Sequence, residues 1–171
     1  MASRDSQKQR LYDWENTISA TDYPSLYNRL TFEEVESLVK TVWEYWCPGE
    51  RPPMVKNMGN RNIAARGCRQ YVQFPRWSWF PRVVLHECAH ALEEGTNSNR
   101  QSKWQYTGKG TSPHGAEFAR IFCDLLEWHC GHNLVKSAYS AKIKVAPRAT
   151  SSAKPQKRRS QKVIESMRAV K

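Results

Sequence analysis

Residues 84–92 read Val-Leu-His-Glu-Cys-Ala-His-Ala-Leu, an apolar run that contains the pattern H-E-x-x-H. On a helix, residues four positions apart lie on one face, so His86 and His90 could bind a single metal ion. Glu87 lies roughly 100° further round the helix, where it could reach a water bound to that metal and take its proton. The pattern predicts a hydrolytic metal site if a helix and a third ligand accompany it.

The sequence around the motif predicts two helices. The first is expected over residues 81–94, with Pro81 near its start and Gly95 ending it, so the motif falls in mid-helix. The second is expected over residues 114–130, after the N-terminal signal Ser112-Pro113 and before Gly131. The linking segment, residues 95–113, is long for a compact domain and is predicted to be a lid over the site.

Three further elements are expected upstream. Residues 4–17 form a short helix with one apolar side made by Leu11, Trp14 and Ile18. Thr31 and Glu34 form a capping box, which begins a helix with six apolar residues at helical spacing: Val35, Leu38, Val39, Val42, Trp43 and Trp46. Residues 69–74 give the best strand candidate. Helices combined with a short sheet place the chain in the α+β class.

Five histidines limit the search for a third ligand, and His114 is the strongest candidate. It begins its helix on the side of Phe118, which would face the motif helix. His129 is fifteen residues further on, roughly 22 Å at helical rise, and therefore too far for the same ion. It is expected to be a partly buried or terminal histidine, and its position near a helix C-terminus also suits a cation. Glu117 stays open as an alternative ligand, whereas Glu93, about 10 Å along the axis from His86, is better suited to orienting a ligand.

The motif and the later block His114-Gly115-Ala116-Glu117-Phe118 resemble the SprT-like zinc metallopeptidases, whose H-E-x-x-H is followed by H-G-x-x-F at the start of a later helix. The chain is also similar to small metallohydrolases of phages and actinobacteria, which often open with a segment like residues 4–7. The resemblance covers about residues 63–130. It implies a small zincin-like domain, one Zn²⁺ per chain, His86, His90 and His114 as ligands, and Glu87 as general base.

Charge is distributed unevenly along the chain. Residues 1–135 contain 16 Lys and Arg against 15 Asp and Glu, whereas residues 136–171 contain 11 against one. We therefore expect a metallohydrolase domain over residues 1–135 and a basic, disordered tail over residues 136–171. The tail could make non-specific contacts with nucleic acid through its basic cluster, which comprises Lys154, Lys157, Arg158, Arg159 and Lys162.

The leading hypothesis is a zinc metallopeptidase that acts on a protein or peptide, with the strand at 69–74 binding an extended substrate by strand addition. Lys103, Tyr106 and Lys109 are candidates for stabilising the oxyanion. The alternative is a non-catalytic, nucleic-acid-associated binding protein with a structural zinc site. Five scattered cysteines, no visible export signal and no long apolar run favour a cytoplasmic protein without a membrane span, in the host cytoplasm if a phage encodes it.

Overall fold

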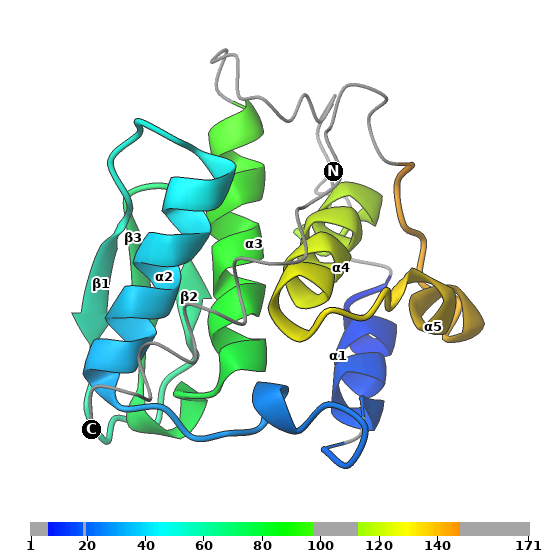
Figure 1. Cartoon of the computed structure of the whole chain (residues 1–171), viewed down its shortest axis with the longest axis horizontal. Helices are drawn as coiled ribbons and strands as arrows, with labels where there is room; N and C mark the ends of the chain where they lie inside the picture. The colour runs from blue at the N-terminus through cyan, green and yellow to red at the C-terminus, as the bar shows by residue number, and fades with distance from the viewer. Residues whose placement is uncertain (1–6, 19, 98–112, 148–171) are drawn as a thin grey trace.

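The computed structural model describes residues 7–18, 20–97 and 113–147. Helix α3 (Pro81–Asn97), which carries the motif, lies at the centre of this part of the chain. A small sheet packs on one side of α3 and helix α4 (Ala116–Cys130) packs on the other (Figure 1). The expected combination of helices with a short sheet is confirmed. The motif helix thus lies between the sheet on one side and α4 on the other.

The sheet has the strand order β1-β3-β2, made by β1 (Met54–Asn57), β3 (Tyr71–Phe74) and β2 (Arg66–Gly67). Strand β3 pairs in parallel with β1 and antiparallel with β2, so both of its edges are occupied. Alternation along β3 buries Val72 and Phe74. The strand expected at 69–74 is present from Tyr71, but it is central. The expectation that this strand binds a substrate strand is therefore wrong. In the described part of the chain, the strands with a free edge are β1 and β2.

Helix α2 (Phe32–Trp46) begins as its sequence predicts. The Glu34 backbone N–H donates to Thr31 Oγ1 at 3.2 Å, and the Thr31 backbone N–H donates to Glu34 Oε2 at 2.8 Å. The six apolar residues of its stripe are all buried. Helix α2 packs on α3 and on strand β1, and lies beside the motif helix in Figure 1.

Two helix ends differ from expectation. Helix α3 continues through Gly95 to Asn97, because one glycine costs a helix only about 1 kcal/mol and does not necessarily end it. Helix α4 starts at Ala116, with Gly115 as its N-cap, so His114 lies in the turn before the helix. Gly131 ends α4 in the left-handed conformation, at φ 77°, as expected.

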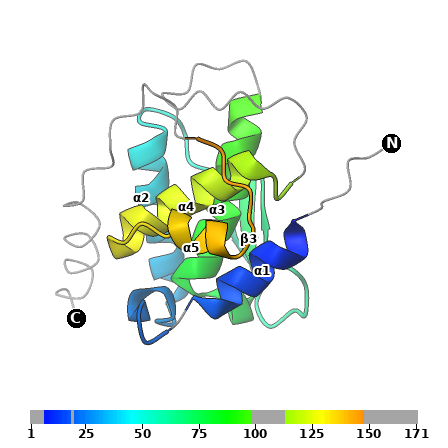
Figure 2. The same cartoon turned by 90° about the vertical axis from the view of Figure 1, so that its right-hand side faces the viewer.

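Helix α1 (Lys8–Thr17) packs beside α4 and α5 (Val135–Ser140), as Figure 2 shows from the side. Its expected apolar residues, Leu11, Trp14 and Ile18, are buried. Trp14 Nε1 donates to Ser137 Oγ of α5 at 2.9 Å. Two short 3₁₀ turns, η1 (Pro24–Leu26) and η2 (Arg76–Ser78), complete the described elements. The N-terminal helix is therefore part of the core.

The folded part extends beyond the expected boundary between residues 135 and 136. Helix α5 crosses that boundary, and Ala138, Ile143 and Val145 are buried in the core. The expectation that residues after 135 form only a tail is therefore wrong up to Val145. The basic cluster at 154–162 lies outside the described residues.

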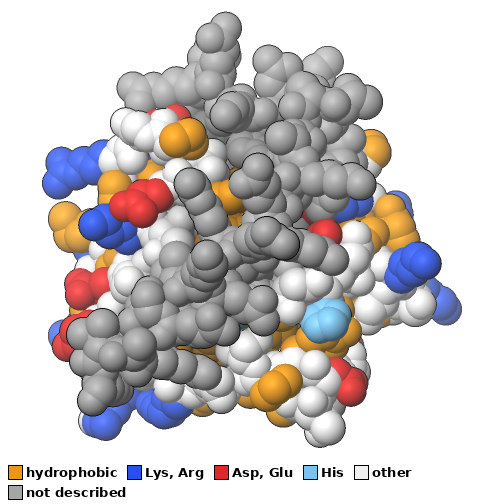
Figure 3. All heavy atoms as spheres, viewed as in Figure 1, with side chains coloured by type: hydrophobic (Ala, Val, Ile, Leu, Met, Phe, Trp, Pro, Cys, Tyr) orange, Lys and Arg blue, Asp and Glu red, His pale blue; other side chains and the backbone are white. Residues whose placement is uncertain are grey.

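Figure 3 shows acidic and basic side chains dispersed over the described atoms of one face, without a single basic patch there. This agrees with the near-neutral balance of residues 1–135. None of the helices in the described ranges is both long and apolar enough for a membrane crossing.

Candidate metal centre

Three histidines from two sides of the fold converge on one point. His86 and His90 project from the same face of α3, with ring centroids 5.1 Å apart, and His114 approaches from the turn before α4. One ring nitrogen of each lies within 4.8 Å of the others, and together these residues could hold a metal ion. His86 and His114 are buried and His90 is partly buried. His114 thus lies beside His86 and His90, as the sequence predicts.

The spacing of the nitrogens fits one small cation. Nε2 of His90 lies 3.2 Å from Nε2 of His114. Two nitrogens bound to the same tetrahedral zinc at 2.0–2.1 Å would be about 3.3 Å apart. Phe118 of α4 packs against all three imidazoles, with ring centroids 4.3–5.1 Å away, and covers one side of the cluster. A neutral donor set in an apolar surrounding is one that zinc accepts.

Burial keeps His90 neutral. Desolvation, followed by the neighbouring His86 and His114, lowers the pKa of His90 to about 2, and Lys8 adds to this effect. A neutral imidazole keeps a nitrogen lone pair for a metal, whereas a protonated one has none. His90 is therefore ready to act as a ligand near pH 7.

A carboxylate that the sequence interpretation missed orients His86. Glu15 of α1 is buried, and its Oε2 lies 3.1 Å from Nδ1 of His86. Burial alone would lower the pKa of His86, but the charge of Glu15 and this hydrogen bond outweigh it and raise that pKa. If Nδ1–H donates to Glu15, Nε2 is directed to the cluster, an arrangement common for histidines that bind metals. Arg82 lies 3.9 Å from the other Glu15 oxygen.

A weak signal for Glu15 was present in the sequence. It stands four residues after Leu11 and three before Ile18, on the side of α1 that was expected to be apolar. A carboxylate on a core-facing side needs a partner, because an unpaired buried charge is costly. That partner is His86, 71 positions away in sequence.

Glu87 is buried beside the cluster, at 7% exposure. Burial raises the pKa of its carboxyl, and the charge of Glu15 adds to this, whereas His86 and the Gly67 backbone N–H act in the opposite direction. A raised carboxyl pKa favours proton acceptance and release near neutral pH. Strand β2 lies very close to this residue: a Cβ built on Gly67 would be 1.9 Å from the Glu87 carbonyl oxygen. Only glycine permits that approach.

Other sequence-predicted residues fall outside the cluster. Within the described residues, the group able to hold a metal contains neither Glu117 nor Glu93. Burial raises the pKa of Glu117, and Glu93 is buried and has an interaction of its own. The expectation of a cationic His129 is wrong, because burial lowers its pKa to about 4. Residues 103, 106 and 109 lie outside the described part, as do residues 98–112 of the lid expected over 95–113.

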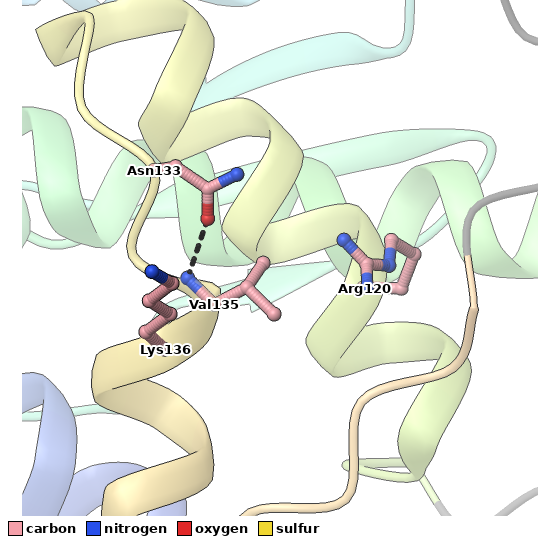
Figure 4. A pocket seen from close by; sticks show the side chains of 4 residues that line it. All are labelled: Arg120, Asn133, Val135 and Lys136. Atoms are coloured by element: carbon pink, nitrogen blue, oxygen red, sulfur yellow. Dashed lines mark hydrogen bonds between the residues drawn. The ribbon is translucent and has the colours of Figure 1, made fainter.

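A cavity of about 570 Å³ lies elsewhere, between α4 and α5, and is lined by Arg120, Asn133, Val135 and Lys136 (Figure 4). Arg120 donates through Nε to the Ala146 carbonyl at 2.6 Å and lies 3.5 Å from Asp124. Asn133 Oδ1 accepts from the Val135 backbone N–H at 3.0 Å. The Arg120–Ala146 bond joins α4 to the segment after α5, and the Asn133 bond precedes the first turn of α5, so Arg120 and Asn133 have structural roles here.

Comparisons of the chain with models of protein families, with curated proteins and with solved structures found no match. The resemblance to SprT-like metallopeptidases therefore rests on the motif residues alone.

Proposed function

We propose that the protein is a zinc-dependent hydrolase, most specifically a metallopeptidase. The observation that carries the proposal is the convergence of His86, His90 and His114 beside the buried carboxylate Glu87. The three imidazoles would hold the zinc ion, which would supply Lewis-acid polarisation of a carbonyl and lower the pKa of a water molecule toward neutrality.

Residues of the chain carry out proton transfer, orient a ligand and exclude water. Glu87 takes the proton of the attacking water and returns it to the leaving amine, which its raised pKa favours. Glu15 holds the ring of His86 in orientation. Phe118 covers the cluster and limits the access of bulk water.

Strand β2 is the substrate platform that fits this site. Within the described residues it pairs on one side only, with β3, and it packs against α3 at Glu87. An extended peptide added to its free edge would pass beside the cluster, with main-chain hydrogen bonds that do not depend on side chains. Peptide is the favoured substrate class for this reason.

The test compares two Glu→Gln variants. The wild type should bind about one zinc per chain and cleave casein in a chelator-sensitive manner. Glu87→Gln should keep its zinc and lose roughly 10²–10⁴-fold in turnover, since the general base is removed. Glu117→Gln is the matched control on the facing helix and should retain both zinc and activity. Full activity of Glu87→Gln would refute the mechanism.

A further inference from the structure

Helix α1 brings a tyrosine to the metal cluster. The Tyr12 ring stacks on His86, with centroids 5.5 Å apart and planes 14° apart, and meets the edge of His114 at 5.4 Å. Its hydroxyl oxygen lies 3.5 Å from Nε2 of His114. The same nitrogen lies 3.2 Å from Nε2 of His90, so the hydroxyl is close to one of the atoms that bring the cluster together.

The hydroxyl is therefore close to His114, one of the three residues that could hold a metal ion. A tyrosine hydroxyl can donate one hydrogen bond. When His114 Nε2 binds a metal, its lone pair no longer accepts a hydrogen bond. The phenol can then donate to an oxygen of the substrate.

The hydroxyl is also held in place by its helix. Gln7, the residue before α1, donates through Nε2 to the His114 carbonyl at 2.6 Å and accepts from the Lys144 backbone N–H at 3.0 Å. Glu15, three residues after Tyr12, is hydrogen-bonded to His86. The helix is thus fixed at both ends to the cluster that it serves. A donor fixed before the reaction needs no reorganisation as charge develops, and this is how oxyanion stabilisation works.

We infer that Tyr12 is a further catalytic residue, whose phenol donates a hydrogen bond to the substrate carbonyl oxygen as negative charge develops there during attack on the carbonyl carbon. The phenol keeps its proton, and the charge on the oxygen is relieved when the carbonyl re-forms and the amine leaves. This inference rests on the proposed hydrolase function. It assigns to α1 the oxyanion role that the sequence placed in residues 103–109.

The experiment compares Tyr12→Phe with Tyr139→Phe, a matched change at an exposed tyrosine of α5. Phenylalanine keeps the ring that stacks on His86 and removes only the hydroxyl. Three measurements are made on each protein: zinc affinity by chelator competition, kcat and KM on casein, and calorimetric binding of acetohydroxamate to the zinc-loaded protein. Acetohydroxamate presents oxygens to a metal without requiring turnover.

Tyr12→Phe should bind zinc as tightly as the wild type, lose roughly 10²-fold in kcat with KM within about twofold, and bind acetohydroxamate about tenfold more weakly. Tyr139→Phe should match the wild type throughout. Unchanged kcat overturns the inference, and so does weaker zinc binding, which would make Tyr12 a ligand or a support for the histidines. If the wild type cleaves no casein, the proposed function fails, but acetohydroxamate binding still tests the inference about Tyr12. Weaker binding by Tyr12→Phe than by the wild type supports the inference, and equal binding overturns it.

Discussion

Helix α4 has a buried histidine at each end, and the two differ in what surrounds them. His114, in the turn before the helix, is 6% exposed, and His129, in its last turn, is 5% exposed. His114 meets His86, His90 and Tyr12. Within the described residues, neither ring nitrogen of His129 makes a hydrogen bond of ordinary geometry, although the Ser25 backbone lies near enough to raise its pKa slightly.

The comparison shows that burial alone does not make a metal ligand. Burial lowers the pKa of His129 to about 4, and burial with neighbouring histidines lowers that of His90 to about 2, so both imidazoles are neutral near pH 7. Neutrality supplies a lone pair in each case. Among the residues that the structure describes, ring nitrogens of three histidines converge only at the His114 end of α4.

Replacing each histidine of α4 should give the largest contrast. His114→Ala removes one of the three proposed ligands and should weaken zinc binding by more than about 100-fold. Losing a group that only hydrogen-bonds to a ligand costs up to about 100-fold, and losing the ligand itself should cost more. His129→Gln should leave zinc affinity unchanged. Chelator competition and zinc per chain measure both. Equal zinc binding by the two variants would remove His114 from the site.

Two glycines allow the region of the metal cluster to be compared with the His129 end of α4 without replacing a histidine. Gly67→Ala places a Cβ 1.9 Å from the Glu87 carbonyl oxygen, so strand β2 must move away from α3. We expect a loss of about 3 kcal/mol in unfolding free energy, together with weaker casein cleavage.

Gly131→Ala is the control at the His129 end of α4. Its Cβ would meet nothing within 4 Å, and only the left-handed backbone, at φ 77°, opposes the change. About 1 kcal/mol should be lost in urea unfolding, with cleavage unchanged. If Gly67→Ala proved as mild as Gly131→Ala, the close approach of β2 to α3 would be wrong.

Removing the carboxylate behind His86 should have a smaller effect than removing a ligand. Glu15→Ala should weaken zinc binding roughly 10–100-fold, the usual effect of losing a group that orients a metal-binding histidine. Glu15→Gln keeps an oxygen that can accept from His86 Nδ1–H and should lose less. Both are measured by chelator competition at pH 7.5. Wild-type zinc affinity in Glu15→Ala would show that His86 needs no support from α1.

The elements that the sequence predicts best are those defined by local pattern. The capping box of Thr31 and Glu34, the buried stripe of α2 and the helical position of the motif all depend on neighbours within a turn or two. His114 could be found because few histidines are present and distance excludes His129. Its role still required α4 to pack against α3, which periodicity indicates only as an apolar face.

Contacts distant in sequence could not be predicted in this way. Tyr12 and Glu15 reach the cluster because α1 packs against it, and no local pattern specifies that packing. The order of the strands is a similar case. Strand β2 has two residues and no alternation that could identify it as a strand. The longer strand at 69–74 was therefore expected to bind the substrate at a sheet edge, but the edge beside it belongs to β2. The predicted end of α3 at Gly95 was wrong for another reason, since one glycine costs a helix only about 1 kcal/mol and need not end it.

The last contrast concerns pH and isolates His129. Its pKa is about 4 in the folded protein and about 6.5 when unfolded, so the unfolded state binds more protons between these values. The stability that neutral His129 contributes is therefore fully present above pH 6.5 and is lost as pH falls toward 4. From pH 8 to pH 5 this amounts to about 2 kcal/mol, which His129→Gln should not lose. Urea unfolding of both proteins at the two pH values measures it, since protonation of the metal cluster acts on both alike. A parallel pH dependence in the two proteins would mean that His129 is solvated or hydrogen-bonded. His129 and His114 would then differ in their access to water and not only in their neighbouring residues.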